Sequence, residues 1–310
     1  MKKVFIDGEA GTTGLRIRER LAARTDIELV TLPEALRKDA AARKTALNAA
    51  DIAFLCLPDA AAVEAVSMIE NPDTVVLDTS TAHRTDPRFV YGFPELAAEQ
   101  AAQIAASKRI AVPGCHASGF IAAVAPLVQH GLLAPDAALT CHSVTGYSGG
   151  GKKMIAAYGE ADRSPLYDAP RQYGLSQTHK HLPEMTAMCG LQSPPIFCPI
   201  VADFYSGMVV TVPLFAHQLT PGATAADVKA VLKAAYGGSI VRYVVTADAD
   251  GFLSAAALSG KDAMEVAVFG SETRILLTAR YDNLGKGASG AAVECMNLVL
   301  GVDPATGLNL

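Results

Sequence analysis

The chain has 310 residues, of which 50% are hydrophobic and 18% charged, and it carries a net charge of −5. That length and composition indicate a compact protein of two domains. No basic cluster stands out beyond Lys152-Lys153, which argues against a nucleic-acid partner. None of the six cysteines forms a C-x-x-C pair, so the sequence predicts neither a zinc knuckle nor a disulfide framework.

The amino terminus reaches an acid, Asp7, before an apolar core of signal-peptide length develops. The stretch 110–135 contains no charged residue and is apolar enough to suggest a membrane span. Pro113, Gly114 and Pro126 interrupt it, so it is interpreted as a buried strand, a turn and a helix. We therefore expect a cytoplasmic protein without a membrane partner.

A first strand, residues 3–6, is followed by a glycine-rich turn and a helix over residues 15–21. The turn has the spacing G-x-x-G-x-x-G, which differs from the usual dinucleotide motif but permits the same chemistry. Glycines let the backbone approach a pyrophosphate, and the start of a helix offers free N–H groups and positive potential. Alone the motif is weak, but this setting predicts a dinucleotide site made by Gly8, Gly11, Thr12, Thr13 and Gly14.

The end of the second strand, residues 27–32, bears on the choice of cofactor. Enzymes that prefer NAD usually place an acid there to bind the ribose 2′-hydroxyl. Here Pro33 displaces the only candidate, Glu34, and the basic side chains of Arg37 and Lys38 follow. The pattern favours a 2′-phosphate, so we expect NADP(H), with Arg37 among its ligands.

Two further buried strands, residues 51–57 and 74–78, alternate with a helix over 60–69. Ligands bind at the carboxyl ends of strands in such parallel sheets. The loop 79–84, with Ser80, is therefore a candidate part of the cofactor cleft, and ordinary helix capping by a solvated loop is the alternative.

Cys115 follows a short strand, 110–112, and the sharp turn Pro113-Gly114, and it begins an apolar helix. Free N–H groups and the helix dipole at such a position favour a thiolate over a thiol. A cysteine taken at random is more often a buried structural residue. This setting instead predicts a reactive nucleophile.

The pattern changes after residue 131. Strands are expected at 139–145, 208–216, 240–246, 265–270 and 274–281, with a helix over 225–236 and another ending at Leu300. Few helices separate the last strands, so this half is predicted to be α+β with a largely antiparallel sheet. The first half is predicted to be a doubly wound, Rossmann-type parallel sheet.

Two segments of this second half could take part in chemistry. In His179-Lys180-His181-Leu182-Pro183-Glu184, the carboxylate of Glu184 could orient His181 if the segment is helical, giving the acid/base that a thioester mechanism needs. A zinc-binding pair and a plain surface pair of histidines are the alternatives. The glycine-rich loop after strand 139–145 could hold a substrate phosphate or carboxylate through Ser148, Gly149, Gly150 and Lys152, or could be a flexible turn.

Together the glycine turn, Pro113–Phe120, Ser148–Lys152, His179–Glu184 and Asp282–Gly290 resemble the N-acetyl-γ-glutamyl-phosphate reductase family in its shorter type. The resemblance implies an NADP-dependent reductase of arginine biosynthesis, related to aspartate-semialdehyde dehydrogenase. It implies that Cys115 is the nucleophile and His181 the acid/base, with Tyr173 and Glu184 beside them and Asn283 near the cofactor.

The resemblance also implies that the last helix completes the nucleotide domain. The expected division is therefore 1–114 plus 285–310 for the NADP-binding domain and 115–284 for the catalytic and dimerisation domain. A homo-oligomer, a tetramer or a dimer, is expected. Two alternatives stay open: an aspartate-semialdehyde dehydrogenase, and a nucleotide sensor without catalysis, which would have no need of Cys115 and His181.

Overall fold

The computed structural model describes all residues, 1–310, and divides them into two compact units. The first unit comprises Met1–Pro94, Ala98–Pro113 and Ala288–Leu308. The second comprises Glu95–Ala97, Gly114–Gly287 and Asn309–Leu310. The functional domain limits predicted from the sequence, 1–114 plus 285–310 and 115–284, stay a prediction.

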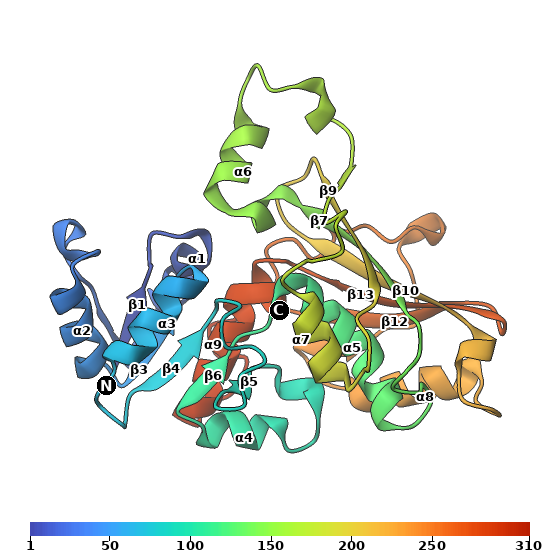
Figure 1. Ribbon diagram of the computed structural model, residues 1–310, viewed down its shortest axis with the longest axis horizontal. Coiled ribbons are helices and arrows are strands. Elements are labelled where there is room, and N and C mark those ends of the chain that lie inside the picture. The colour runs from blue at the N-terminus through green and yellow to red at the C-terminus, as the bar shows by residue number, and fades with distance from the viewer. The chain divides into compact units, whose positions relative to one another are not determined.

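The first unit is built on a six-stranded sheet in which every neighbouring pair is parallel, in the order β2-β1-β3-β4-β6-β5 (Figure 1). Its strands are β1 (Lys2–Asp7), β2 (Ile27–Val30), β3 (Ile52–Leu55), β4 (Val75–Asp78), β5 (Val90–Tyr91) and β6 (Arg109–Ala111). Its helices are α1 (Thr12–Leu21), α2 (Ala40–Ala49), α3 (Asp59–Met68), α4 (Gln100–Ala106) and α9 (Gly290–Leu300), with a 3-10 turn at Glu34–Leu36.

Helices cover both faces of this sheet because its strands are apolar on both sides. Side chains of α1, α4 and α9 form one cluster with Val4 and Ile6 of β1, whereas α2 and α3 form another with Phe5. The alternation along β1 thus directs neighbouring residues into two cores. The Rossmann-type fold predicted from the sequence is confirmed, and α9 of the chain's end belongs to this unit.

The second unit has a seven-stranded sheet in the order β11-β12-β13-β10-β7-β9-β8. The pairs β11–β12 and β7–β9 are parallel and the other neighbours are antiparallel, so the predicted, largely antiparallel α+β architecture is also confirmed. The strands are β7 (Thr140–Gly146), β8 (Arg171–Gln172), β9 (Ile196–Ala202), β10 (Met208–Phe215), β11 (Val241–Tyr243), β12 (Met264–Gly270) and β13 (Arg274–Tyr281).

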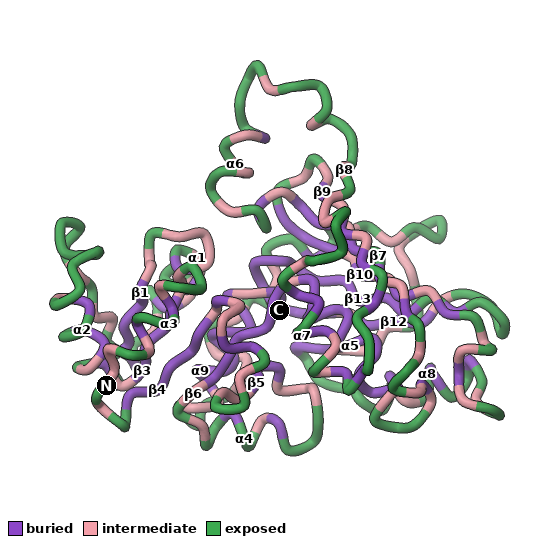
Figure 2. The backbone as a smooth tube through the Cα atoms, viewed as in Figure 1, coloured by how far each residue is buried: buried purple, intermediate pink, exposed green.

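The helices of this unit are α5 (Cys115–Gln129), α6 (Gly151–Gly159), α7 (Leu182–Cys189) and α8 (Ala225–Ala235). Helix α5 packs on β10 and β13 and also contacts α7 and α8. Twelve consecutive residues of α5, His116–Leu127, are buried, which accounts for the long charge-free stretch. Figure 2 shows this buried run in α5 and the strands, in contrast to the exposed segment around α6. No helix combines the length and apolarity that crossing a bilayer requires.

Several elements were not predicted from the sequence: helices α2, α4 and α6, and strands β5, β8 and β9. Strand β9 carries Pro199 in its middle, although proline within a sheet is usually confined to edge strands, strand starts or bulges. It nevertheless pairs in parallel with β7 over its whole length. The segment after Gly150, expected as a loop, forms helix α6, whose Lys, Met and Ala residues are good helix formers.

Candidate active site

The glycine turn of the first unit lies between β1 and α1 and is closed by a Gly11 N–H bond to the Gly8 carbonyl (2.9 Å). Gly8 has a φ of +84°, and a Cβ there would lie 2.3 Å from the Cys56 carbonyl oxygen. A Cβ on Gly14 would lie 2.7 Å from the Gly8 oxygen. The turn therefore requires glycine, and Thr12 and Thr13 form the first turn of α1, where N–H groups lack partners within the helix.

A cavity of about 480 Å³ opens beside this turn within the first unit. The predicted residues Gly8 and Arg37 line it, together with Glu34, Lys38 and Glu9. Arg37 and Lys38 are exposed and neither side chain is engaged in an ion pair. Asp7, which also lines the cavity, is buried and accepts bonds from Arg43 at 3.0–3.2 Å. The residues present thus fit a dinucleotide: a close backbone approach, a helix start and two free cations.

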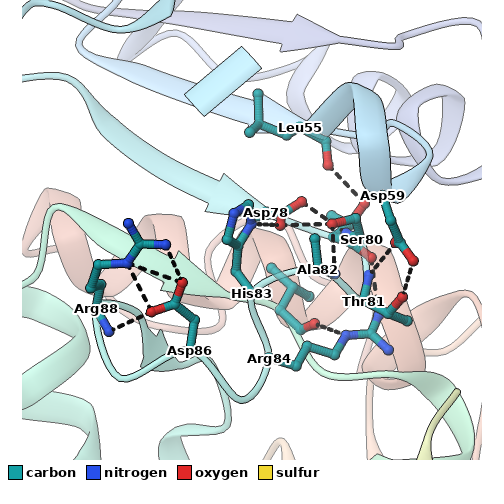
Figure 3. A network of polar contacts seen from close by, with 12 residues as sticks. Leu55, Asp59, Asp78, Ser80, Thr81, Ala82, His83, Arg84, Asp86 and Arg88 are labelled. Atoms are coloured by element: carbon teal, nitrogen blue, oxygen red, sulfur yellow. Dashed lines mark hydrogen bonds and ion pairs between the residues drawn. The ribbon is translucent and has the colours of Figure 1, made fainter. Parts of the chain in front are cut away.

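The loop after β4 is organised around the fully buried Asp78 (Figure 3). This carboxylate accepts the backbone N–H and the hydroxyl of Ser80 (2.9 and 2.7 Å), and it lies 2.6 Å from His83 Nδ1. The Thr81 hydroxyl and backbone N–H donate to Asp59 at the start of α3. Ser80 is therefore engaged in shaping its own loop and is not among the residues lining the 480 Å³ cavity.

In the second unit, Cys115 is the first residue of α5 and is half-buried. The Gly114 N–H just before it donates to Glu184 Oε1 (2.7 Å). The Tyr281 hydroxyl accepts from the Gly119 N–H (2.9 Å) and donates to the Cys115 carbonyl. A Cβ on Gly287 would lie 3.1 Å from the Cys115 Cβ. The turn that carries the thiol is thus fixed from α7, from β13 and from the segment after it.

Aromatic and imidazole rings gather next to this helix start. His116 lies 5.8 Å from His179, 5.6 Å from His181 and 5.3 Å from Phe197, measured between ring centroids. Its Nε2 lies 2.7 Å from the Tyr173 hydroxyl, and its Nδ1 lies 2.7 Å from Ser143 Oγ. Burial, followed by the charges of His179 and Lys180, lowers the pKa of His116 to about 3, so the ring is neutral.

Of the predicted catalytic residues, Tyr173, His181 and Glu184 are thus in one unit with Cys115. His181 occupies the position just before α7, where its side chain makes no capping bond, and is 4% exposed. Its backbone N–H donates to His179 Nδ1 (3.2 Å). Glu184, expected to orient the His181 ring, contacts the turn before Cys115 through its Gly114 bond. Burial and the neighbouring Cys115 raise the pKa of Tyr173, which keeps its phenol protonated.

The predicted substrate loop and Asn283 are joined to each other. Ser148 is 1% exposed and its Oγ accepts from Asn283 Nδ2 (3.0 Å), while Asn283 Oδ1 accepts from the Gly207 N–H (2.9 Å). Gly149 and Gly150 belong to a 3-10 turn over Tyr147–Gly150, and Lys152 is exposed on α6. Asn283, expected near the cofactor, belongs to the second unit and orders Ser148, and the roles of both residues stay predictions.

Three residues of this site were missed from the sequence: His116, Ser143 and Tyr281. His116 could have been found, because it directly follows Cys115, the predicted nucleophile. Ser143 and Tyr281 give no local signal, since each is one polar residue in a strand. No group of three or more His, Cys, Asp or Glu residues is disposed to hold a metal ion.

Comparison with known proteins gives consistent results along the chain. The families described as "Semialdehyde dehydrogenase, NAD binding domain" and "Semialdehyde dehydrogenase, dimerisation domain" match residues 31–104 and 115–283. A protein of Rhizobium etli named N-acetyl-gamma-glutamyl-phosphate reductase is 48% identical over 305 residues, which cover 96% of this chain and 98% of the relative.

Solved structures share the fold at low sequence identity. Aspartate semialdehyde dehydrogenase II of Vibrio cholerae, complexed with ASA, superposes with a TM-score of 0.71 at 16% identity and covers 97% of this chain and 98% of its own. Aspartate semialdehyde dehydrogenase of Candida albicans with NADP superposes with a TM-score of 0.67 at 14% identity, and the match covers 97% of this chain and 99% of its own. With the near-full-length match to the Rhizobium protein, the chain belongs to the N-acetyl-γ-glutamyl-phosphate reductase family, a group of oxidoreductases with the semialdehyde dehydrogenase fold.

Proposed function

We propose that this enzyme reduces N-acetyl-γ-glutamyl phosphate to N-acetylglutamate γ-semialdehyde and phosphate in arginine biosynthesis, using NADPH and a cysteine thioester. The observation that carries the proposal is the half-buried Cys115 at the first position of α5, next to His116 and near Tyr173, with the His181 ring 5.6 Å from that of His116. The name of the Rhizobium relative supports the substrate. Because the family consists of enzymes, the non-catalytic sensor is set aside.

Cys115 acts as the nucleophile in this mechanism. Its thiolate attacks the acyl carbon of the substrate, a C–S bond forms, and the C–O bond to phosphate breaks to leave a thioester. Bound NADPH would supply the hydride that reduces the thioester carbonyl. Protonated His181 gives a proton to the resulting hemithioacetal oxygen or stabilises its negative charge, and breakage of the C–S bond then releases the aldehyde and regenerates Cys115.

Positions around the thiol have supporting roles. Tyr173, protonated at neutral pH, offers a hydroxyl donor next to Cys115. Glu184 fixes the Gly114 turn from which the nucleophile projects. Ser148, Gly149, Gly150 and Lys152 are proposed to hold the phosphate or carboxylate of the substrate, supported by the Asn283 bond that orders Ser148.

The cofactor is proposed to be NADP(H). Gly8, Gly11, Thr12, Thr13 and Gly14 would hold its pyrophosphate, and Arg37 with Lys38 its 2′-phosphate, because these cations line the cavity and are free of ion pairs. Glu34 lines the same cavity and would repel a phosphate placed against it, which makes the choice between NADP and NAD open to a direct test.

A homo-oligomer, a dimer or a tetramer, is also proposed. The match to a dimerisation domain supports it, and so does the sheet face of the second unit opposite α5. A groove of about 690 Å³ is lined there by apolar residues such as Pro213, Phe215 and Leu276, and Phe215 is 56% exposed. The cytoplasm is the proposed location, since all six cysteines are free thiols.

The decisive assay follows the reverse reaction, the reduction of NADP in the presence of inorganic phosphate. N-acetylglutamate γ-semialdehyde should be the good substrate and aspartate β-semialdehyde a poor one, and the opposite order would establish the sister activity. Cys115→Ser should abolish turnover while NADP still binds. His181→Asn should lower turnover by about 10²–10⁴-fold, and His179→Asn much less; the reverse ranking would assign the proton transfer to His179.

A further inference from the structure

His116 bridges two hydroxyl groups that come from distant parts of the second unit. Ser143 lies on β7 and is 0% exposed, and Tyr173 directly follows β8. Each hydroxyl lies 2.7 Å from one ring nitrogen of His116, which is itself 3% exposed. A neutral imidazole has one N–H and one acceptor nitrogen, so only one of the two contacts can be donated by the ring.

The buried serine decides which one. Ser143 Oγ makes its only hydrogen bond to His116 Nδ1. If Nδ1 carried the proton, the hydroxyl proton of Ser143 would be buried without an acceptor, which is costly. Ser143 must therefore donate to Nδ1, and the ring proton is on Nε2, where it is donated to the Tyr173 oxygen. The phenol then accepts from His116, and its own proton is left to another acceptor.

Tyr173 is held at its other end as well. Its backbone N–H donates to the Pro199 carbonyl (3.0 Å). Further along the same segment, Gln177 adopts a left-handed φ of 57° and bonds both the N–H and the carbonyl of Phe197 (2.9 and 2.8 Å). The backbone of this segment is thus tied to β9, and the hydrogen bond to His116 is what fixes the hydroxyl.

We propose that His116 is a positioning residue: with its tautomer set by Ser143, it holds the Tyr173 oxygen through Nε2–H and directs the phenol proton to the reacting oxygen of the substrate at Cys115. The role of the Tyr173 hydroxyl as a donor to the substrate rests on the proposed function. The chain of hydroxyls ends at Ser143, which has no second partner from which to take up a proton. It therefore orients groups and does not relay protons.

Nitrogen-15 spectra of the imidazole test the geometry without any substrate. In the full chain, Nε2 of His116 should give the signal of a protonated nitrogen and Nδ1 that of an unprotonated acceptor. Tyr173→Phe should shift the Nε2 signal, and Ser143→Ala should shift Nδ1. The opposite tautomer, or signals that neither substitution moves, would overturn the inference even if the enzyme acts on another substrate.

Turnover of N-acetyl-γ-glutamyl phosphate tests the consequence. Tyr173→Phe should lower kcat by about 10²-fold, as expected for loss of one donor to a developing oxyanion. Ser143→Ala should lower it about 3- to 10-fold, because the tautomer is no longer fixed. His116→Ala should lower kcat in the wild-type background and change it by less than about 2-fold when Tyr173 is already Phe. Equal effects in the two backgrounds would show that His116 does not act through Tyr173.

Two controls guard against a purely structural effect. His116→Gln keeps an amide near the position of Nε2 and should recover part of the kcat lost in His116→Ala. His130→Ala changes the exposed histidine that follows the same helix and should leave kcat unchanged. Should the wild-type chain fail to reduce the acyl phosphate, the proposed function is refuted, and the nitrogen spectra still decide the arrangement of the three residues.

Discussion

Gly119→Ala is the substitution whose outcome the structure predicts most directly. Gly119 lies in the second turn of α5, where alanine would normally stabilise a helix by about 0.5–1 kcal/mol. Here, however, the Cβ would lie 2.6 Å from the Tyr281 hydroxyl, 2.7 Å from its Cε1 and 2.7 Å from Val210 Cγ2. No real contact is that short, so Tyr281, which is 0% exposed, or the helix must move.

The expected cost follows from two contributions. Overpacking of a buried site costs about 1–3 kcal/mol. Displacement of the phenol also breaks its bonds with the Gly119 N–H and the Cys115 carbonyl, each worth about 1 kcal/mol. After subtraction of the helix-propensity gain, we expect the free energy of unfolding to fall by about 2–4 kcal/mol.

Urea denaturation followed by circular dichroism measures this change. Gly159→Ala is the matched control, since it also lies in a helix and its Cβ would meet no atom within 4 Å. It should leave stability unchanged or raise it by up to about 1 kcal/mol. Adding Tyr281→Phe to Gly119→Ala removes one of the three clashes and should be less harmful than the sum of the two changes. A Gly119→Ala protein as stable as the wild type would refute the reasoning.

Three further predictions concern the thiols, the cofactor and the pH dependence of stability. Iodoacetamide at neutral pH should label Cys115 first, and the enzyme should lose activity in parallel. The reason is that burial raises the pKa of Cys56 to about 12 and also raises the pKa of Cys141 and Cys189. Labelling of Cys56 in step with inactivation would count against Cys115. Arg37→Ala with Lys38→Ala should raise the Michaelis constant for NADP and not that for NAD, and equal constants before and after would show that another group reads the 2′-phosphate. Below pH 6.5 His116 is protonated in the unfolded chain but not in the folded chain, because burial lowers its pKa to about 3. The free energy of unfolding should therefore fall by up to about 1.4 kcal/mol per pH unit as the pH is lowered. In denaturation experiments, His116→Gln should show a shallower fall of this free energy with pH.

The sequence by itself determined the elements whose causes are local. Apolar strands alternating with helices predicted the parallel sheet, and Gly8 and Gly14 occupy positions where any Cβ would clash with backbone. Pro113-Gly114 followed by an apolar run placed Cys115 at the start of α5. The motifs together also identified the family, which the relatives confirm.

Only the tertiary structure decided which side chains meet. Glu184 contacts Gly114 across 70 residues, Ser148 and Asn283 are 135 apart, and Tyr281 reaches Gly119 across 162. Strand β9, which was not predicted from the sequence, provides the Pro199 carbonyl that accepts the Tyr173 N–H. A hydrogen bond of this kind depends on where two packed elements bring single polar atoms, and residues so far apart carry no spacing rule in the sequence.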